Sequence, residues 1–190
     1  MERELLITGI GGQGVQLAAQ VLARAATLEG REVMYLGLYG GMMRGGNTDS
    51  TVVVADAPIL APPVVSRAWA AIAMHDDYWP AVESKLRPGA LVLVNDTTFT
   101  SEIRDDVQVH RVAATTVATD LGTPLSGSLV MLAAFCATTG IVSLDGLVAA
   151  MQASIPSYRT QHIEANERAL RAGWDLLAHN AYPAWETANV

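Results

Sequence analysis

The sequence predicts one α/β domain over residues 1–190, with a mainly parallel, Rossmann-like sheet flanked by helices and a helix-rich C-terminal third. Three observations carry this prediction. Short apolar runs alternate with stretches of helical spacing in the first half, which is typical of right-handed βαβ units. The last third contains helical stretches without strands, which we expect to cover one face of the sheet. A chain of 190 residues suits one domain with a sizeable core, and no repeat or linker divides it.

The first strand is predicted at Leu5–Thr8, because this short segment is apolar throughout. Apolar residues then recur at helical intervals from Val15 to Leu28, and Gly30 closes this helix. Further strands are predicted at residues 31–38, 50–56, 68–77, 90–96 and 107–114. Residues 39–50 contain four glycines without periodicity and are predicted as a loop.

The remaining elements are predicted as helices. A short helix is expected within residues 77–89, where Pro88 and Gly89 stop it. Three longer helices are expected at residues 126–140, 143–155 and 159–180. The last of them carries one apolar side, formed by Ile163, Leu170, Trp174 and Leu177.

Composition narrows the class of protein. Hydrophobic residues make up 51% and charged residues 16%, which is apolar for a free-standing monomer and indicates that partners cover much of the surface. No apolar run approaches the ~20 residues of a membrane-spanning helix, and the charged start "MERELLITG" is unlike a secretory signal, so we expect a cytoplasmic location. The net charge of −7, without a basic stripe, disfavours a nucleic-acid surface.

Cys136 is the only cysteine of the chain. One cysteine can neither form an internal disulfide nor supply the four thiolates that an iron–sulfur cluster usually takes. We therefore expect Cys136 to be a small core residue, and we expect any redox metal to be held by another chain.

A glycine pattern follows the first predicted strand and precedes the first helix. "GIGGQG" fits G-x-G-x-x-G at Gly9, Gly11 and Gly14. The free N–H groups at the helix start favour negative charge. A dinucleotide site would also have an acidic residue after the second strand, but "MYLGLYGG" has none, which disfavours NAD. Two interpretations stay open: another phosphate-bearing ligand, or a tight turn without a ligand.

A second loop bears on this choice. If the first two strands are parallel neighbours, residues 9–14 and 39–48 lie at the same edge of the sheet. Arg44, in "MRGGN", would then lie beside a helix N-terminus, where a guanidinium and backbone amides together suit a phosphate or carboxylate. The alternative is a salt bridge from Arg44 to a neighbouring subunit.

Together, "GIGGQGV" and "YGGMMRGGNTDSTVVVAD" resemble the gamma subunit or domain of the 2-oxoacid:acceptor oxidoreductases, which include pyruvate, indolepyruvate and phenylglyoxylate oxidoreductases. "LRPGALVLVND" and "NERALRAGWDLL" resemble later segments of the family, so the resemblance spans nearly the whole chain. The chain departs from the family pattern at Ser128 and Ala133, where many members have asparagine and glycine, and at Met42–Met43, where many relatives have an acidic residue.

The resemblance implies a subunit of an enzyme that oxidatively decarboxylates a 2-oxoacid and transfers the acyl group to coenzyme A. Thiamine diphosphate and iron–sulfur clusters would lie in partner subunits and pass electrons to ferredoxin or another acceptor. This chain would hold no cofactor, metal or catalytic residue alone, but would frame the site and contact coenzyme A. The expected cofactor-binding residues are Gly9, Gly11, Gly12, Gln13, Gly14, Arg44, Gly45, Gly46 and Asn47. The alternative is a stand-alone nucleotide- or ligand-binding α/β regulatory protein.

Other candidate chemistry is weaker. His75, Asp76 and Asp77 follow a predicted strand, where adjacent side chains point in different directions, so a metal or acid–base role is disfavoured. We expect Asp76 or Asp77 to cap the next helix instead. His162 and Glu164 are interpreted as part of a solvated helix face.

Overall fold

The computed structural model describes residues 1–39, 45–60 and 62–185. Within these ranges a six-stranded sheet has the order β2-β3-β1-β4-β5-β6. Its strands are β1 Glu2–Ile10, β2 Glu32–Tyr39, β3 Asn47–Ala55, β4 Ala68–Ala73, β5 Leu86–Asn95 and β6 Gln108–Val112. The helices are α1 Val15–Leu28, α2 Trp79–Glu83, α3 Ala114–Asp120, α4 Gly127–Thr139, α5 Leu144–Ser154 and α6 Ile163–Trp174, with 3-10 turns η1 Pro124–Ser126 and η2 Ser157–His162.

The sheet is mostly parallel, as the sequence predicts, but one strand reverses. β1, β4, β5 and β6 pair in parallel, whereas β3 is antiparallel to both β1 and β2. The expectation that the first two strands are neighbours is therefore wrong. The chain returns from β2 as a hairpin, and β3 fills the place beside β1. β3 begins at Asn47, earlier than expected, because its polar first residues pair with strands on both sides.

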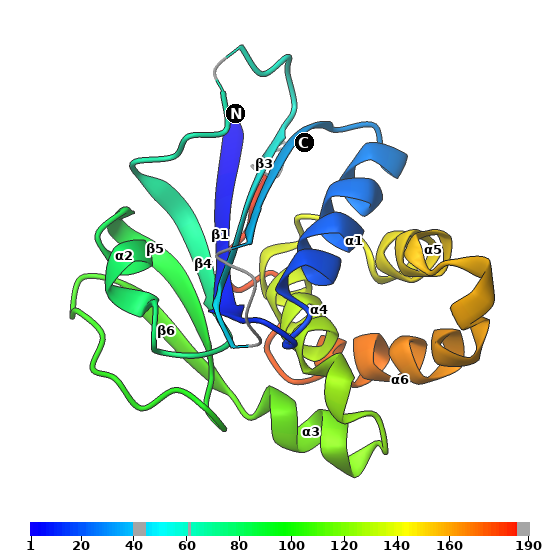
Figure 1. Cartoon of the computed structure of the whole chain (residues 1–190). Helices are drawn as coiled ribbons and strands as arrows, with labels where there is room; N and C mark the ends of the chain where they lie inside the picture. Colours follow the sequence, from blue (N-terminus) through cyan, green and yellow to red (C-terminus); the bar gives the residue numbers. More distant parts are fainter. Residues whose placement is uncertain (40–44, 61, 186–190) are drawn as a thin grey trace.

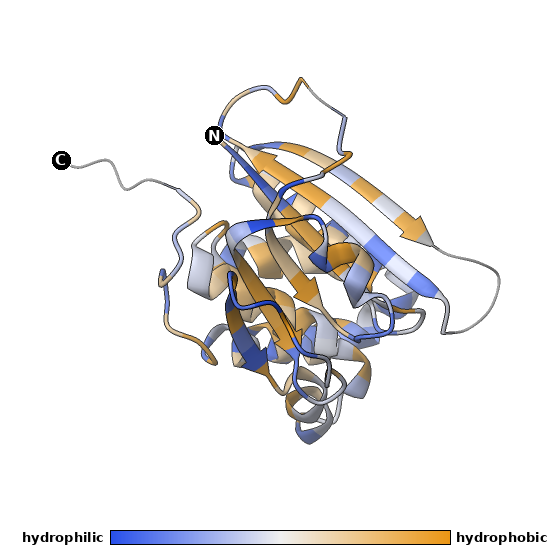
Figure 2. Cartoon of the chain, turned by 90° about the vertical axis from the view of Figure 1, so that its left-hand side faces the viewer, coloured by the Kyte–Doolittle hydropathy of each residue, from blue (hydrophilic) through white to orange (hydrophobic). Residues whose placement is uncertain are grey.

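Helices cover the two faces of the sheet unequally (Figure 1). α1, α4, α5 and α6 lie on one side, so the predicted covering of one face by the helix-rich end is confirmed. α2 lies on the other side, where Trp79 packs against Phe99. Figure 2 shows the apolar residues concentrated along the strands and inner helices.

α4 is the central helix of the larger layer. Every residue of α4 is buried, and its residues are apolar on all sides, as expected for a helix enclosed by the sheet and other helices. Cys136 has an exposed fraction of 0%, which confirms the predicted core position, and burial raises the pKa of its thiol. None of the helices in the described ranges is long and apolar enough to cross a membrane.

Two helical segments differ from the sequence prediction. α3 was not predicted, because its sequence "ATTVATD" is rich in β-branched residues of low helix propensity. α6 ends at Trp174 rather than near residue 180, and the turn before it is the 3-10 segment η2. The predicted apolar side is confirmed: Leu170 is buried, and Ile163, Trp174 and Leu177 pack against the core.

α4 and α6 approach each other closely at Gly173. A Cβ at this position would overlap the backbone carbonyl of Val130 in α4, and backbone atoms cannot turn away as a side chain can. We expect Gly173→Ala to lower the free energy of unfolding by about 1–3 kcal/mol, the usual cost of overpacking. Denaturant unfolding of the full chain measures this. Helix propensity alone predicts the opposite sign, a gain of about 1 kcal/mol, and such a gain would contradict the packing account.

Candidate functional site

The chain adds strands first on one side of β1 and then on the other. After β1 it builds β2 and β3 on one side, and it then returns to place β4 on the other side. In open α/β sheets, ligands bind outside the carboxyl ends of the strands at such a switch point. Residues 11–14, which connect β1 to α1, lie at this point.

Hydrogen bonds hold this loop on both sides. The Gln13 side chain accepts a hydrogen bond from Ile10 N (2.9 Å) and donates one to the carbonyl of Met74, directly after β4 (3.1 Å). Gly11 N donates to Gly46 O (2.9 Å), so the residue before β3 lies beside the loop after β1, although the parallel pairing from which this proximity was expected is absent. The Gln13 amide thus connects the loop to the end of β1 through its oxygen and to the end of β4 through its nitrogen. Arg44 lies outside the described residues.

The glycines of the loop serve different purposes. A Cβ on Gly9 would lie 2.6 Å from Gln13 Oε1, and one on Gly14 would lie 2.5 Å from Ser128 Oγ in α4. These two glycines therefore permit close packing. Gly12 has a φ of 102°, and a Cβ there would meet nothing within 4 Å. Gly12 is the glycine that faces open space.

Two helix N-termini adjoin this open space. α1 and α4 both begin without a side-chain cap and without an acidic residue in the first turn. Gly12 and the start of α1 line a hollow of about 290 Å³, and Gly12 and Gly127 of α4 line another of about 200 Å³. Uncapped N–H groups carry the positive end of the helix dipole and favour an anion.

Hydroxyl groups complete the walls of the two hollows. Thr48 lines the larger one; its exposed fraction is 4%, and its Oγ1 has no hydrogen-bond partner among the described residues. Thr98 and Thr115 line the smaller one. No charged side chain of the described residues lines either hollow. We call residues 11–14 with the start of α1, Thr48, Thr98, Thr115 and Gly127 the glycine-loop site.

Asn95 fixes the wall formed by the two threonines. This residue is fully buried at the end of β5. Its Nδ2 donates to Thr98 Oγ1 (2.9 Å) and Thr115 Oγ1 (2.8 Å), and its Oδ1 accepts from Thr115 N (3.2 Å). The sequence patterns did not predict this network, although Asn95 is a polar residue at the carboxyl end of the apolar run "ALVLV".

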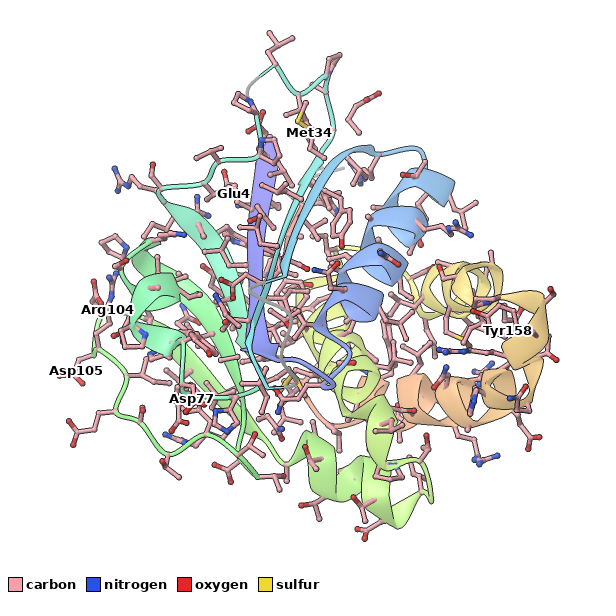
Figure 3. All side chains as sticks on the ribbon, in the orientation of Figure 1. Glu4, Met34, Asp77, Arg104, Asp105 and Tyr158 are labelled. Atoms are coloured by element: carbon pink, nitrogen blue, oxygen red, sulfur yellow. The ribbon has the colours of Figure 1, made fainter. Side chains whose placement is uncertain are left out.

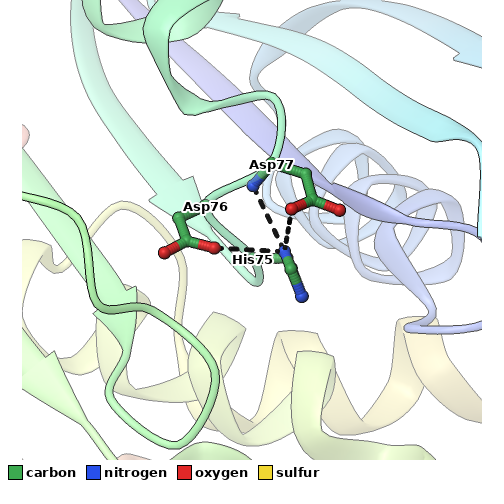
Figure 4. A group of neighbouring side chains, drawn as sticks. All are labelled: His75, Asp76 and Asp77. Carbon is green, nitrogen blue, oxygen red and sulfur yellow. Dashed lines mark hydrogen bonds and ion pairs between the residues drawn. The ribbon is translucent and has the colours of Figure 1, made fainter.

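His75, Asp76 and Asp77 converge, contrary to the expectation that adjacent side chains diverge (Figure 4). His75 Nδ1 lies 3.3 Å from Asp76 Oδ1 and 3.5 Å from Asp77 Oδ1. The expected cap of the next helix is wrong, since α2 has no side-chain cap. Asp76 Oδ2 instead accepts hydrogen bonds from the backbone and hydroxyl groups of Thr100 and Ser101, because these groups follow β5 at the same edge.

The hydrogen bonds from Thr100 and Ser101 lower the pKa of Asp76. A lowered pKa means that the carboxylate stabilises the fold above the pKa of the unfolded chain, about 3.9, and that this contribution disappears as the pH falls through the folded-state pKa. We expect Asp76→Asn to be less stable than wild type at pH 7, with a difference that shrinks below about pH 4. Urea unfolding across this range measures it, with Asp77→Asn as the exposed control. A stability difference between Asp76→Asn and wild type that is independent of pH would contradict the stabilising role of the Asp76 carboxylate.

Comparisons with known proteins agree on one group. The family model described as pyruvate ferredoxin/flavodoxin oxidoreductase matches residues 4–176. The chain is 33% identical over 184 residues to 2-oxoglutarate synthase subunit KorC of Methanothermobacter thermautotrophicus, covering 93% of this chain and 96% of that one. It is 30% identical over 181 residues to pyruvate synthase subunit PorC of Methanothermobacter marburgensis, covering 93% and 98%.

A solved structure is similar over the same length. The gamma subunit of a keto/oxoacid ferredoxin oxidoreductase from Geobacter sulfurreducens superimposes with a TM-score of 0.78 and 26% identity. The match covers 92% of this chain and 95% of that subunit.

Proposed function

Since this chain belongs to the pyruvate ferredoxin/flavodoxin oxidoreductase family and is a gamma subunit of a multi-subunit 2-oxoacid:ferredoxin oxidoreductase, we propose that its glycine-loop site binds the diphosphate of coenzyme A. The complex would decarboxylate a 2-oxoacid oxidatively and transfer the acyl group to the coenzyme A thiol. The relatives are named for 2-oxoglutarate and for pyruvate. Coenzyme A is the acyl acceptor in both reactions, so a subunit that binds coenzyme A can have the same role with either 2-oxoacid.

Thiamine diphosphate and iron–sulfur clusters are assigned to partner subunits in this proposal. The chain's own residues do not fit a cluster, because Cys136 is the only cysteine and is fully buried in α4. The role of this subunit is therefore to position the acyl acceptor and to frame the site that partner subunits complete.

The observation that carries the proposal is the arrangement around Gly12. The starts of α1 and α4, neither of which has a side-chain cap, line two adjoining hollows that share Gly12. The backbone N–H groups at these helix starts favour an anion, and no charged side chain among the described residues lines either hollow. Gly45, Gly46 and Asn47 extend the site on the side of β3, where Gly46 O accepts the hydrogen bond from Gly11 N.

The same edge is poorly suited to a nicotinamide dinucleotide. In dinucleotide sites an acidic residue at the end of the neighbouring parallel strand binds the ribose hydroxyls. Here the strand that follows α1, β2, is not a neighbour of β1, because the antiparallel β3 lies between them. The acidic residue of β3, Asp49, already accepts hydrogen bonds on both oxygens, from Thr8 Oγ1 (2.6 Å) and Asn47 Nδ2 (2.8 Å).

Gly12→Ala tests the proposal directly. The new Cβ would enter the open space of the site, and the positive φ adds strain of about 1 kcal/mol, which is too little to unfold a domain of ordinary stability. We expect a folded chain whose affinity for coenzyme A is reduced about tenfold or more, on the order of 1.4 kcal/mol. Calorimetric titration of the full chain with coenzyme A and with NADH measures this, followed by activity of the reconstituted complex.

Gly30→Ala is the matched control. Gly30 also has a positive φ, 78°, and its Cβ would also meet nothing within 4 Å, but it lies beyond the opposite end of α1. This variant carries the same strain and should bind coenzyme A as wild type does. Micromolar binding of NADH by wild type, or unchanged coenzyme A affinity in Gly12→Ala, would refute the proposal.

A further inference from the structure

The edge strand β2 carries apolar side chains on both of its faces. Val33 and Tyr35 pack against the core on the side of α1. Met34, Leu36 and Leu38 alternate with them and therefore lie on the opposite side of the sheet. An antiparallel strand with one solvated face normally alternates apolar and polar residues. The sequence of β2 is instead typical of a strand that is covered on both faces.

We call Met34, Leu36 and Leu38 the β2 stripe. None of the three belongs to, or packs against, either cluster of buried apolar residues in the described part of the chain. Leu38 has an exposed fraction of 56%, and Met34 and Leu36 are half-buried. α2 lies on the same side of the sheet, but its residues pack with those of β4 and β5. Figure 2 looks onto this side, where no helix lies in front of β2 and β3.

The apolar surface continues from the β2 stripe onto β3. Residues that are directly opposite each other in paired strands share one face, and Val53 of β3 is opposite Met34. Val53 and Val64 line a hollow of about 210 Å³, formed with the segment between β3 and β4. Val64 has an exposed fraction of 79%. A contiguous exposed apolar surface beside a hollow is typical of a site where another protein binds.

The charged residues at the border of this surface are mostly acidic. Glu2 of β1 and Glu32 of β2 are opposite the same residue of β3, so their carboxylates share the face of the stripe. No ion pair of Glu2 or Glu32 occurs within the described ranges. Glu4 lies in the next row with Met34, on the side of the sheet away from α1 (Figure 3). Arg67 lines the hollow beside them.

This distribution of charge favours a different chain over a second copy of this one. The cross-strand rows of β1, β3 and β2 that share this face contain Glu2, Glu4, Glu32 and Asp49, but no lysine or arginine. Two copies that met through this face would therefore bring carboxylates together, which is unfavourable. A chain that offers apolar side chains bordered by lysine or arginine would gain both apolar burial and charge complementarity.

We infer that the β2 stripe and the hollow beside it form the surface that docks this chain onto another subunit of the oxidoreductase, one with an apolar face bordered by basic residues. The inference uses the membership of a multi-subunit enzyme and does not depend on coenzyme A binding. α1 and α4 lie on the other side of the sheet (Figure 1), so docking at the β2 stripe leaves the starts of these helices accessible.

Leu38→Gln tests the apolar part of the surface. Because Leu38 packs against neither core cluster, we expect the isolated full chain to unfold in urea as wild type does. We expect its affinity for the remaining subunits, prepared together without this chain, to fall about tenfold or more, since one leucine is no longer buried. Leu28→Gln is the matched control: Leu28 ends α1, has an exposed fraction of 61%, and should leave assembly unchanged.

Glu32→Gln tests the charged border. We expect a severalfold lower association rate constant with the remaining subunits at low salt, because charges at the rim of an interface steer the encounter. The difference should shrink at high salt, where such charges are screened. Glu102→Gln, an exposed acidic residue between β5 and β6, is the control and should associate as wild type does.

Hydroxyl-radical footprinting of wild type, alone and in the complete complex, needs no variant. We expect Met34, Leu36 and Leu38 to be protected in the complex, and Leu28 to be labelled equally in both states. An unprotected β2 stripe in the complex, or Leu38→Gln assembling with wild-type affinity, would overturn the inference. A dimer of the isolated chain that Leu38→Gln abolishes would assign the surface to a second copy, and would also overturn it. Neither result bears on coenzyme A binding, which we expect Leu38→Gln to retain.

Discussion

The Gln13 side chain holds the carboxyl edge of the sheet together, and the candidate site depends on it. Its oxygen closes the turn after β1, and its nitrogen ties that turn to the end of β4. With the loop fixed in this way, Gly14 can approach Ser128, which places the starts of α1 and α4 around the same space. Donors that are oriented before a ligand arrives bind it without a further ordering cost.

The glycine pattern thus has two origins. Gly9 and Gly14 are required by packing, because a Cβ at either position would overlap a side chain of the loop or of α4. A stand-alone structural turn explains these two positions fully. The turn also favours glycine at position 12, where φ is 102°, but a Cβ on Gly12 would meet nothing within 4 Å, so the space beside it stays open. Ser128 Oγ, which lies beside Gly14, is buried without a hydrogen-bond partner among the described residues.

Local sequence patterns predicted most of the helices and strands. They failed where contacts between segments distant in the sequence determine the structure. The apolar runs predicted the strands and the helical spacings predicted the long helices, because the periodicity of buried side chains differs between the two structures. The position of β3 beside β1 depends on pairing with two other strands, which no local pattern in "NTDS" contains. Likewise, one groove of the surface is lined by Leu17, Leu125 and Asn166, which come from three separate segments. The hydrogen bonds that Asp76 accepts from Thr100 and Ser101 likewise join two neighbouring strand ends, which are distant in the sequence.

We propose that the backbone amides around Gly12 bind the diphosphate of coenzyme A. Amide chemical shifts of the isotope-labelled full chain, recorded during titration with coenzyme A, test it most directly, since glycine amides occupy a separate region of the spectrum. We expect saturable shifts for Gly11, Gly12, Gly14 and Gly127, and unchanged shifts for Gly30 and Gly173. Saturable binding that leaves the amides of residues 11–14 unshifted would contradict it.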